Sequence, residues 1–171
     1  MTPRRPLAAA LLAVLLAATA GACGGDGDKG KDTKVTTGST ASGEKTEGTA
    51  VSLKALLNPA EEVPGPGVKD GIGRVGIDVA GPKVCSDVKV TMGEKPVAAH
   101  IHKGAMGMSG PVVVDLKPVF ESGESAYMSK TCVDTTAATA SQLIADPAAY
   151  YVNIHSDGHP DGAMRGQLSK F

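Results

Sequence analysis

Four histidines lie in two short segments of the chain and have the spacing of metal ligands. His100 and His102 occur in AHIHKGAMGMSGPV, and His155 and His159 occur in YYVNIHSDGHPDGAMRGQL. Two residues apart on a β-strand, the first two imidazoles point to the same face, roughly 6.5 to 7 Å apart along the chain. If the two segments pair, the four histidines and the neighbouring aspartates form a donor set that suits zinc or copper(II).

Other chemistry has weaker support in the sequence. Met106 and Met108 carry thioethers, which suit copper(I), but their glycine neighbours favour an exposed loop. Glu61 and Glu62 lie in an extended segment, no serine has a nucleophile-elbow context, and no glycine motif opens a helix after a strand. We therefore expect a protein without enzymatic activity and without a cofactor, unless the histidines bind copper or zinc.

The elements that must position these residues are predominantly strands. Short apolar runs alternate with Gly, Pro, Asn and Asp clusters from Val51 onward, which predicts one antiparallel β-sandwich or barrel-like domain of about eight strands. The expected strands are 50–57, 73–80, 83–92, 97–102, 111–116, 125–133, 149–155 and 163–168. One short helix is predicted over 136–146, capped by Thr135 or Thr136 and stopped by Pro147. The fold class is all-β.

Both histidine segments, together with AEEVP at 60–64, resemble the CHRD domain, a module of secreted proteins. The resemblance extends from Val51 to Leu168. It rests on Ala99 to His102 with Gly104, Gly110 to Val113, Tyr151 to Asn153 with His155, Pro160 with Gly162, and Arg165 to Gln167. It implies an extracellular β domain with no assigned enzymatic chemistry and no assigned ligand.

Five polar residues among the matching positions favour a structural role. They alternate with apolar residues near strand ends, where imidazoles can donate to backbone carbonyls and fix the loops 103–110 and 156–162. These five are His102, Asn153, His155, Arg165 and Gln167. His159 lies outside the matching positions. The alternatives are a copper or zinc site for storage, delivery or superoxide dismutase-like activity, and a site for an organic ligand or a protein partner.

The N-terminus has the pattern of a bacterial secretory signal. Arg4 and Arg5 precede the apolar run LAAALLAVLLAATA, and small residues precede Cys23. The cysteine position resembles a lipobox, so we expect a signal peptide over 1–22 and a diacylglycerol on Cys23; an ordinary signal with an incidental cysteine is the alternative. Residues 23–49 would then be the lipidated cysteine and a linker, and 50–171 the CHRD-like domain.

The linker composition favours a flexible tether, because a Gly-, Ser- and Thr-rich stretch with one valine cannot bury enough apolar surface to fold. We expect an exported protein held on the outer face of the cytoplasmic membrane, with an extracytoplasmic protein or ligand as a further partner. The net charge of −1 and the absence of a basic stripe exclude nucleic-acid binding.

The cysteine count predicts one disulfide. If Cys23 carries lipid, Cys85 and Cys132 remain as a pair in an oxidising compartment. Two unpaired thiols are the alternative.

Overall fold

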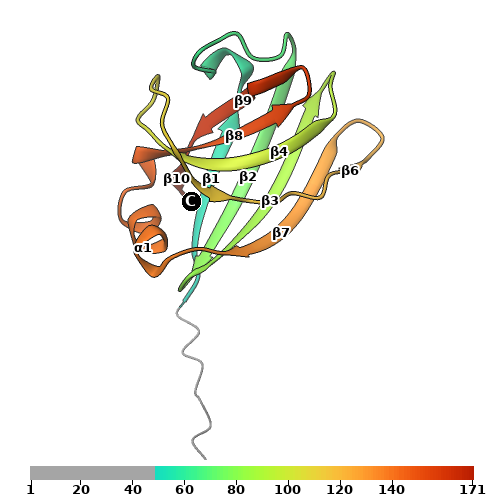
Figure 1. Cartoon of the computed structure of the whole chain (residues 1–171). Helices are drawn as coiled ribbons and strands as arrows, with labels where there is room; N and C mark the ends of the chain where they lie inside the picture. Colours follow the sequence, from blue (N-terminus) through green and yellow to red (C-terminus); the bar gives the residue numbers. More distant parts are fainter. Residues whose placement is uncertain (1–48) are drawn as a thin grey trace, which may run out of the picture. The chain divides into compact units, whose positions relative to one another are not determined.

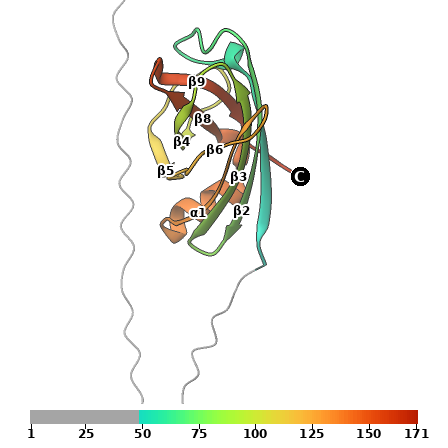
Figure 2. The same cartoon turned by 90° about the vertical axis from the view of Figure 1, so that its right-hand side faces the viewer.

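The computed structural model describes residues 49–171, which form two antiparallel sheets packed face to face (Figure 1, Figure 2). The six-stranded sheet has the order β10-β1-β2-β3-β7-β6 and the four-stranded sheet the order β5-β4-β8-β9. The predicted all-β sandwich with one short helix is confirmed. The strands are β1 Val51–Leu57, β2 Gly71–Ala80, β3 Lys83–Met92, β4 Pro96–Lys103, β5 Val112–Asp115, β6 Glu121–Ser122, β7 Tyr127–Asp134, β8 Tyr150–Ser156, β9 His159–Gln167 and β10 Ser169–Lys170.

Strict alternation of side chains builds the core between the sheets. Val75, Ile77 and Val79 of β2 are buried, as their spacing of two residues predicts, and the even-numbered residues of β3 from Val84 to Met92 face the same interior. Because the chain is poor in aromatic residues, valine, leucine, isoleucine, alanine and methionine fill most of the space. This periodicity determines which residues of each strand point away from the core.

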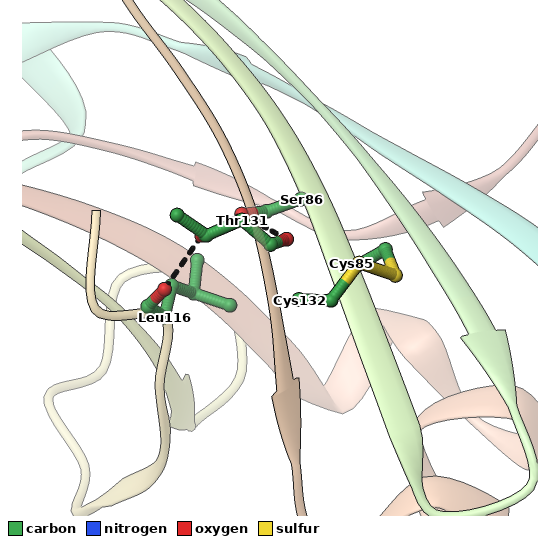
Figure 3. The surroundings of a disulfide bond; sticks show 5 residues. All are labelled: Cys85, Ser86, Leu116, Thr131 and Cys132. Carbon is green, nitrogen blue, oxygen red and sulfur yellow. Dashed lines mark hydrogen bonds between the residues drawn. A yellow bond between two sulfur atoms is a disulfide. The ribbon is translucent and has the colours of Figure 1, made fainter. Parts of the chain in front are cut away.

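The two sheets are joined along both edges of the sandwich. Asn58, just after β1, bridges to Arg165 on β9, and its amide N–H donates to the Arg165 carbonyl at 2.9 Å. On the opposite side the Thr131 hydroxyl of β7 donates to the carbonyl of Leu116, just after β5, at 2.7 Å (Figure 3). The sandwich is therefore closed on both sides, like a flattened barrel.

One α-helix, α1 (Ala137–Ala145), lies at one end of the sheets (Figure 1). Thr136 caps its start, since the Thr136 hydroxyl accepts from the Thr139 amide at 3.0 Å, and Leu143 is fully buried. Two 3-10 turns, η1 (Pro59–Glu61) and η2 (Pro147–Ala149), complete the elements. Among residues 49–171, no helix has the length and hydropathy needed to cross a membrane.

Cys85 and Cys132 form a disulfide between neighbouring strands, as the cysteine count predicts. Cys85 of β3 lies directly opposite Cys132 of β7 in the sheet register, and the two are bonded (Figure 3). Cys23 lies outside the described residues. The disulfide ties β7 to β3, its neighbour in the six-stranded sheet.

Removing this disulfide should destabilise the domain markedly. The bridged cysteines are 47 residues apart in sequence, and closing a loop of that size in the unfolded chain contributes on the order of 4 kcal/mol. Urea unfolding of a Cys85→Ala/Cys132→Ala variant should show a free energy of unfolding lower by about this amount. Masses of the native chain before and after reduction should differ by two hydrogens; equal masses would contradict the pairing.

Candidate metal centre

The candidate site lies on the outer face of the four-stranded sheet. Because Ala99 and Ile101 of β4 enter the core, His100 and His102 point to the other side. The same alternation on β8 and β9 brings Tyr151, Asn153, His155 and Arg165 to that face. Cross-strand pairing sets His100 opposite Asn153 and His102 opposite Tyr151. Strand pairing thus collects polar side chains from three neighbouring strands.

Two loops cover this polar face: the β1–β2 loop (58–70) and the β4–β5 loop (104–111). The loops contact each other, since the Ser109 hydroxyl donates to the Val63 carbonyl at 3.0 Å. Beneath them, Arg165 is only 2 % exposed and donates from Nη2 to the Met108 carbonyl at 3.0 Å. The polar face is therefore largely removed from water, although it lies outside the hydrophobic core.

Three imidazoles meet in this covered region. His100 Nδ1 lies 3.0 Å from His155 Nε2, and one ring nitrogen from each of His100, His102 and His155 lies within 4.8 Å of the other two. Within the described part of the chain, the structure thus brings together three of the four histidines predicted as metal ligands.

The fourth predicted ligand, His159, has a different partner. Its Nδ1 lies 3.1 Å from Glu94 Oε2, and Glu94 also accepts from the Ser156 hydroxyl. Met106 and Met108, the candidate copper(I) ligands, are exposed on the β4–β5 loop. Neither His159 nor these methionines belong to the three-histidine group.

Backbone carbonyls fix the orientation of two of the rings. The Nδ1 atoms of His102 and His155 lie 2.9 Å from the carbonyls of Gly110 and Pro160, respectively. Since a carbonyl only accepts, each Nδ1 carries the proton, and in the neutral ring Nε2 carries the lone pair. His102 Nε2 is buried and has no hydrogen-bond partner within residues 49–171.

Gly110 reaches His102 because it has no side chain. A Cβ at this position would collide with the backbone carbonyl of Lys103, on the other limb of the same loop. The close approach of the two limbs lets the Gly110 carbonyl accept from His102, while the Gly110 amide donates to the Tyr151 hydroxyl at 3.2 Å. The ring of Tyr151 stacks on that of His102, with centroids 4.9 Å apart.

His100 lies between a nitrogen and a carboxylate. Its Nδ1 faces the Nε2 lone pair of His155, so without a metal ion Nδ1 must donate to that atom. Its Nε2 lies 3.8 Å from Asp115 Oδ1. If the proton moves to Nε2, Asp115 attracts it and Nδ1 presents a lone pair to the same space as the other two imidazoles.

Burial keeps the three imidazoles in the form that binds metals. It lowers the pKa of His100, His102 and His155 below the ordinary value of 6.5, and the proximity of the rings to one another lowers these pKa values further. Asp115 and the carbonyls that accept from the rings act in the opposite direction but are weaker. Metal binding requires neutral imidazole, so the rings are ready for it at neutral pH.

Polar side chains of the face also hold the surrounding loops. Gln167 donates from Nε2 to the carbonyls of Gly104 and Ala148, at 2.8 and 2.7 Å. Arg165 and His102 contact carbonyls of the β4–β5 loop, and His155 contacts the Pro160 carbonyl at the start of β9.

Glu62 is a member of the site that sequence reasoning did not select. Asn153 Nδ2 donates to Glu62 Oε2 at 3.4 Å, and the residue is 6 % exposed. Burial raises the pKa of Glu62 to about 7, against the opposing effects of Arg165 and Asn153. Gly162, with φ of 145°, lies against the carboxylate, where a Cβ would collide with Oε2. The sequence feature that could have indicated Glu62 is its position in AEEVP, one of the segments that resemble the CHRD domain.

The raised pKa of Glu62 makes stability depend on pH. The group binds its proton more tightly in the folded state, so its contribution is full below pH 4.5 and is lost as pH rises through about 7. Measured without metal, Glu62→Gln should gain stability relative to the native chain between pH 5 and pH 8, by at most about 3 kcal/mol. The histidines contribute the same pH dependence in both proteins. A difference in free energy of unfolding between Glu62→Gln and the native chain that stays constant with pH would therefore contradict the raised pKa of Glu62.

Comparison with known proteins identifies the family of the domain that carries this site. The family model of the CHRD domain matches residues 53–168, which include all the strands of both sheets except β10 and the first two residues of β1 and which carry the whole candidate centre. No curated protein and no solved structure matches the chain. Since the match covers more than half of the sequence, the chain belongs to the CHRD domain family.

Proposed function

We propose that this protein is a non-enzymatic CHRD protein, anchored by lipid on the outer face of the cytoplasmic membrane, whose domain binds copper(II) or zinc. One observation carries the metal-binding role: three neutral imidazoles bring ring nitrogens within 4.8 Å of one another. On two of them the other nitrogen already donates to a carbonyl, and on the third it faces a carboxylate.

The distances fit a tetrahedral metal ion. Zinc binds histidine nitrogen at 2.0 to 2.1 Å, so two such ligands of a tetrahedral site lie about 3.3 Å apart. His100 Nδ1 and His155 Nε2 are 3.0 Å apart. Because the third nitrogen is within 4.8 Å of both, small rotations of the rings would bring all three to one ion.

The outer contacts are those of a prepared metal site. Metal-binding histidines generally donate their second N–H to a carbonyl or a carboxylate, which fixes the tautomer and the ring orientation. Gly110 and Pro160 supply carbonyls to His102 and His155, and Asp115 faces His100. Imidazole suits zinc and copper(II), of which copper(II) binds more tightly to a given nitrogen site.

The anchoring part of the proposal rests on the sequence. Arg4, Arg5, the apolar run and Cys23 form the expected signal and lipidation site. The disulfide supports export, because such bonds persist in oxidising compartments.

Metal binding can be measured on the full chain carrying Cys23→Ala and no polyhistidine tag. It should bind one equivalent of copper(II) or zinc. His102→Ala should weaken binding at least 100-fold, whereas His159→Ala, which alters a histidine outside the group, should leave the affinity unchanged. Because the pKa values of the three histidines are lowered, binding should persist slightly below pH 6.5 and disappear as the rings become protonated.

Absence of bound metal at micromolar concentrations would refute the metal-binding role, and so would equal losses in His102→Ala and His159→Ala. Circular dichroism of the metal-free variants provides the control for folding.

Membrane attachment is tested separately by fractionation of cells that produce the native chain or Cys23→Ala. The native protein should sediment with membranes, and inhibition of lipoprotein signal peptidase should impair its processing. The Cys23→Ala protein should move to the soluble exported fraction, because a single change removes all acyl chains. Membrane retention of a Cys23→Ala protein whose signal segment has been removed would argue against the lipid anchor.

A further inference from the structure

The structure holds a candidate for the fourth ligand of the proposed metal site. We infer that the side-chain oxygen of Asn153 binds the same ion as His100, His102 and His155, and that Glu62 orients the Asn153 amide for this role. The inference rests on the proposed metal-binding function and changes the role of Asn153 from a purely structural residue to a ligand.

The position of Asn153 in the sheet places it among the three histidines. On β4 and β8, Asn153 lies directly opposite His100, where Cβ atoms are about 4.5 to 5.5 Å apart. Along β8 it is two residues from His155 and two residues from Tyr151, which lies opposite His102. All these side chains share the outer face. Asn153 therefore occupies the central position of the group.

The Asn153 oxygen is also the atom of the amide that lacks a partner. Asn153 is 3 % exposed, its Nδ2 donates to Glu62 Oε2, and its Oδ1 has no hydrogen bond to any described residue. A buried polar atom left unpaired is unfavourable, because it has lost its hydrogen bonds to water without gaining others. His102 Nε2, on the neighbouring strand β4, is also buried without a hydrogen-bond partner among the described residues. Both atoms present lone pairs, so one cation can satisfy both.

Glu62 determines which atom of the amide remains free. In its ionised form the Glu62 carboxylate only accepts hydrogen bonds, so the amide nitrogen of Asn153 faces Glu62 Oε2 and Oδ1 faces away from it. Glu62 reaches the site from the β1–β2 loop, and Gly162 lies against its carboxylate. Glu62 thus acts as a positioning residue for the Asn153 oxygen, as the backbone carbonyls do for His102 and His155.

A fourth protein ligand gives the site a definite chemical character. Three nitrogens and one oxygen form a complete tetrahedral shell, and closed four-coordinate sites are characteristic of metal retention, whereas catalytic sites keep one position open. The three imidazoles favour zinc or copper(II), because copper(I) prefers sulfur ligands. The closed shell therefore accords with a binding protein that performs no catalysis on the metal.

The test compares zinc affinity and the visible spectrum of cobalt(II) in the full chain carrying Cys23→Ala. Asn153→Leu should lower zinc affinity about tenfold or more and change the cobalt(II) spectrum, because one ligand is lost. In a second variant, Glu62→Gln/Asn153→Asp, the side chain at position 62 becomes the donor and the one at position 153 the acceptor, so the hydrogen bond between them is kept. The aspartate then offers the metal ion a carboxylate oxygen in place of the amide oxygen. This variant should bind zinc at least as tightly as the parent chain and retain a four-coordinate spectrum.

The outcomes separate this inference from the proposed function. If the parent chain binds no metal, the metal-binding function itself fails. If it binds metal and Asn153→Leu has the same affinity and spectrum, the Asn153 assignment is overturned while the three-histidine site stands. A weaker Asn153→Leu with an unchanged spectrum would assign the oxygen to a hydrogen bond with a bound water. Should Asn153→Leu not fold, a tenfold loss in the double variant would overturn the inference.

Discussion

The burial of a polar sheet face beneath two loops is the constraint on which the rest of this structure depends. Glu62, Asn153, His155 and Arg165 are nearly inaccessible to water, and burying such groups without partners costs several kcal/mol in total. Hydrogen bonds from side chains of the sheet to backbone carbonyls offset most of this cost. Those that reach the β4–β5 loop also fix its position over the polar face.

Structural and metal-binding roles of the histidines use different atoms of the same rings. The Nδ1 atoms of His102 and His155 hold the loops, while their Nε2 atoms face the shared space. The two hypotheses drawn from the sequence therefore need not compete. A ring held rigidly by one nitrogen loses less entropy when its other nitrogen binds an ion, so these contacts would prepare the proposed metal site.

Most of the fold could be predicted from the sequence, because the alternation of apolar and polar residues that marks a strand lies within that strand. Eight of the ten strands, the helix and the cysteine pair followed from such local patterns, whereas the two-residue strands β6 and β10 did not. In addition, β9 begins at His159, four residues before the predicted start at 163. Asp157-Gly158 forms a two-residue hairpin turn that pairs Ser156 with His159, and this turn brings His159 to Glu94. Glu62 could not be placed from the sequence, because 91 residues separate it from Asn153 and no local pattern records that contact.

The three imidazoles are not equally buried, and this would affect how fast a metal ion enters and leaves the proposed site. His155 and the Nε2 atom of His102 are buried, whereas the side chain of His100 is 24 % exposed and lies beside the half-exposed carboxylate of Asp115. In the proposed metal site, an arriving cation would meet the negative charge of Asp115 first, then the ring of His100, and then the deeper nitrogens. Such a one-sided entrance would favour capture and would make release slow, because the ion would have to leave the buried ligands first.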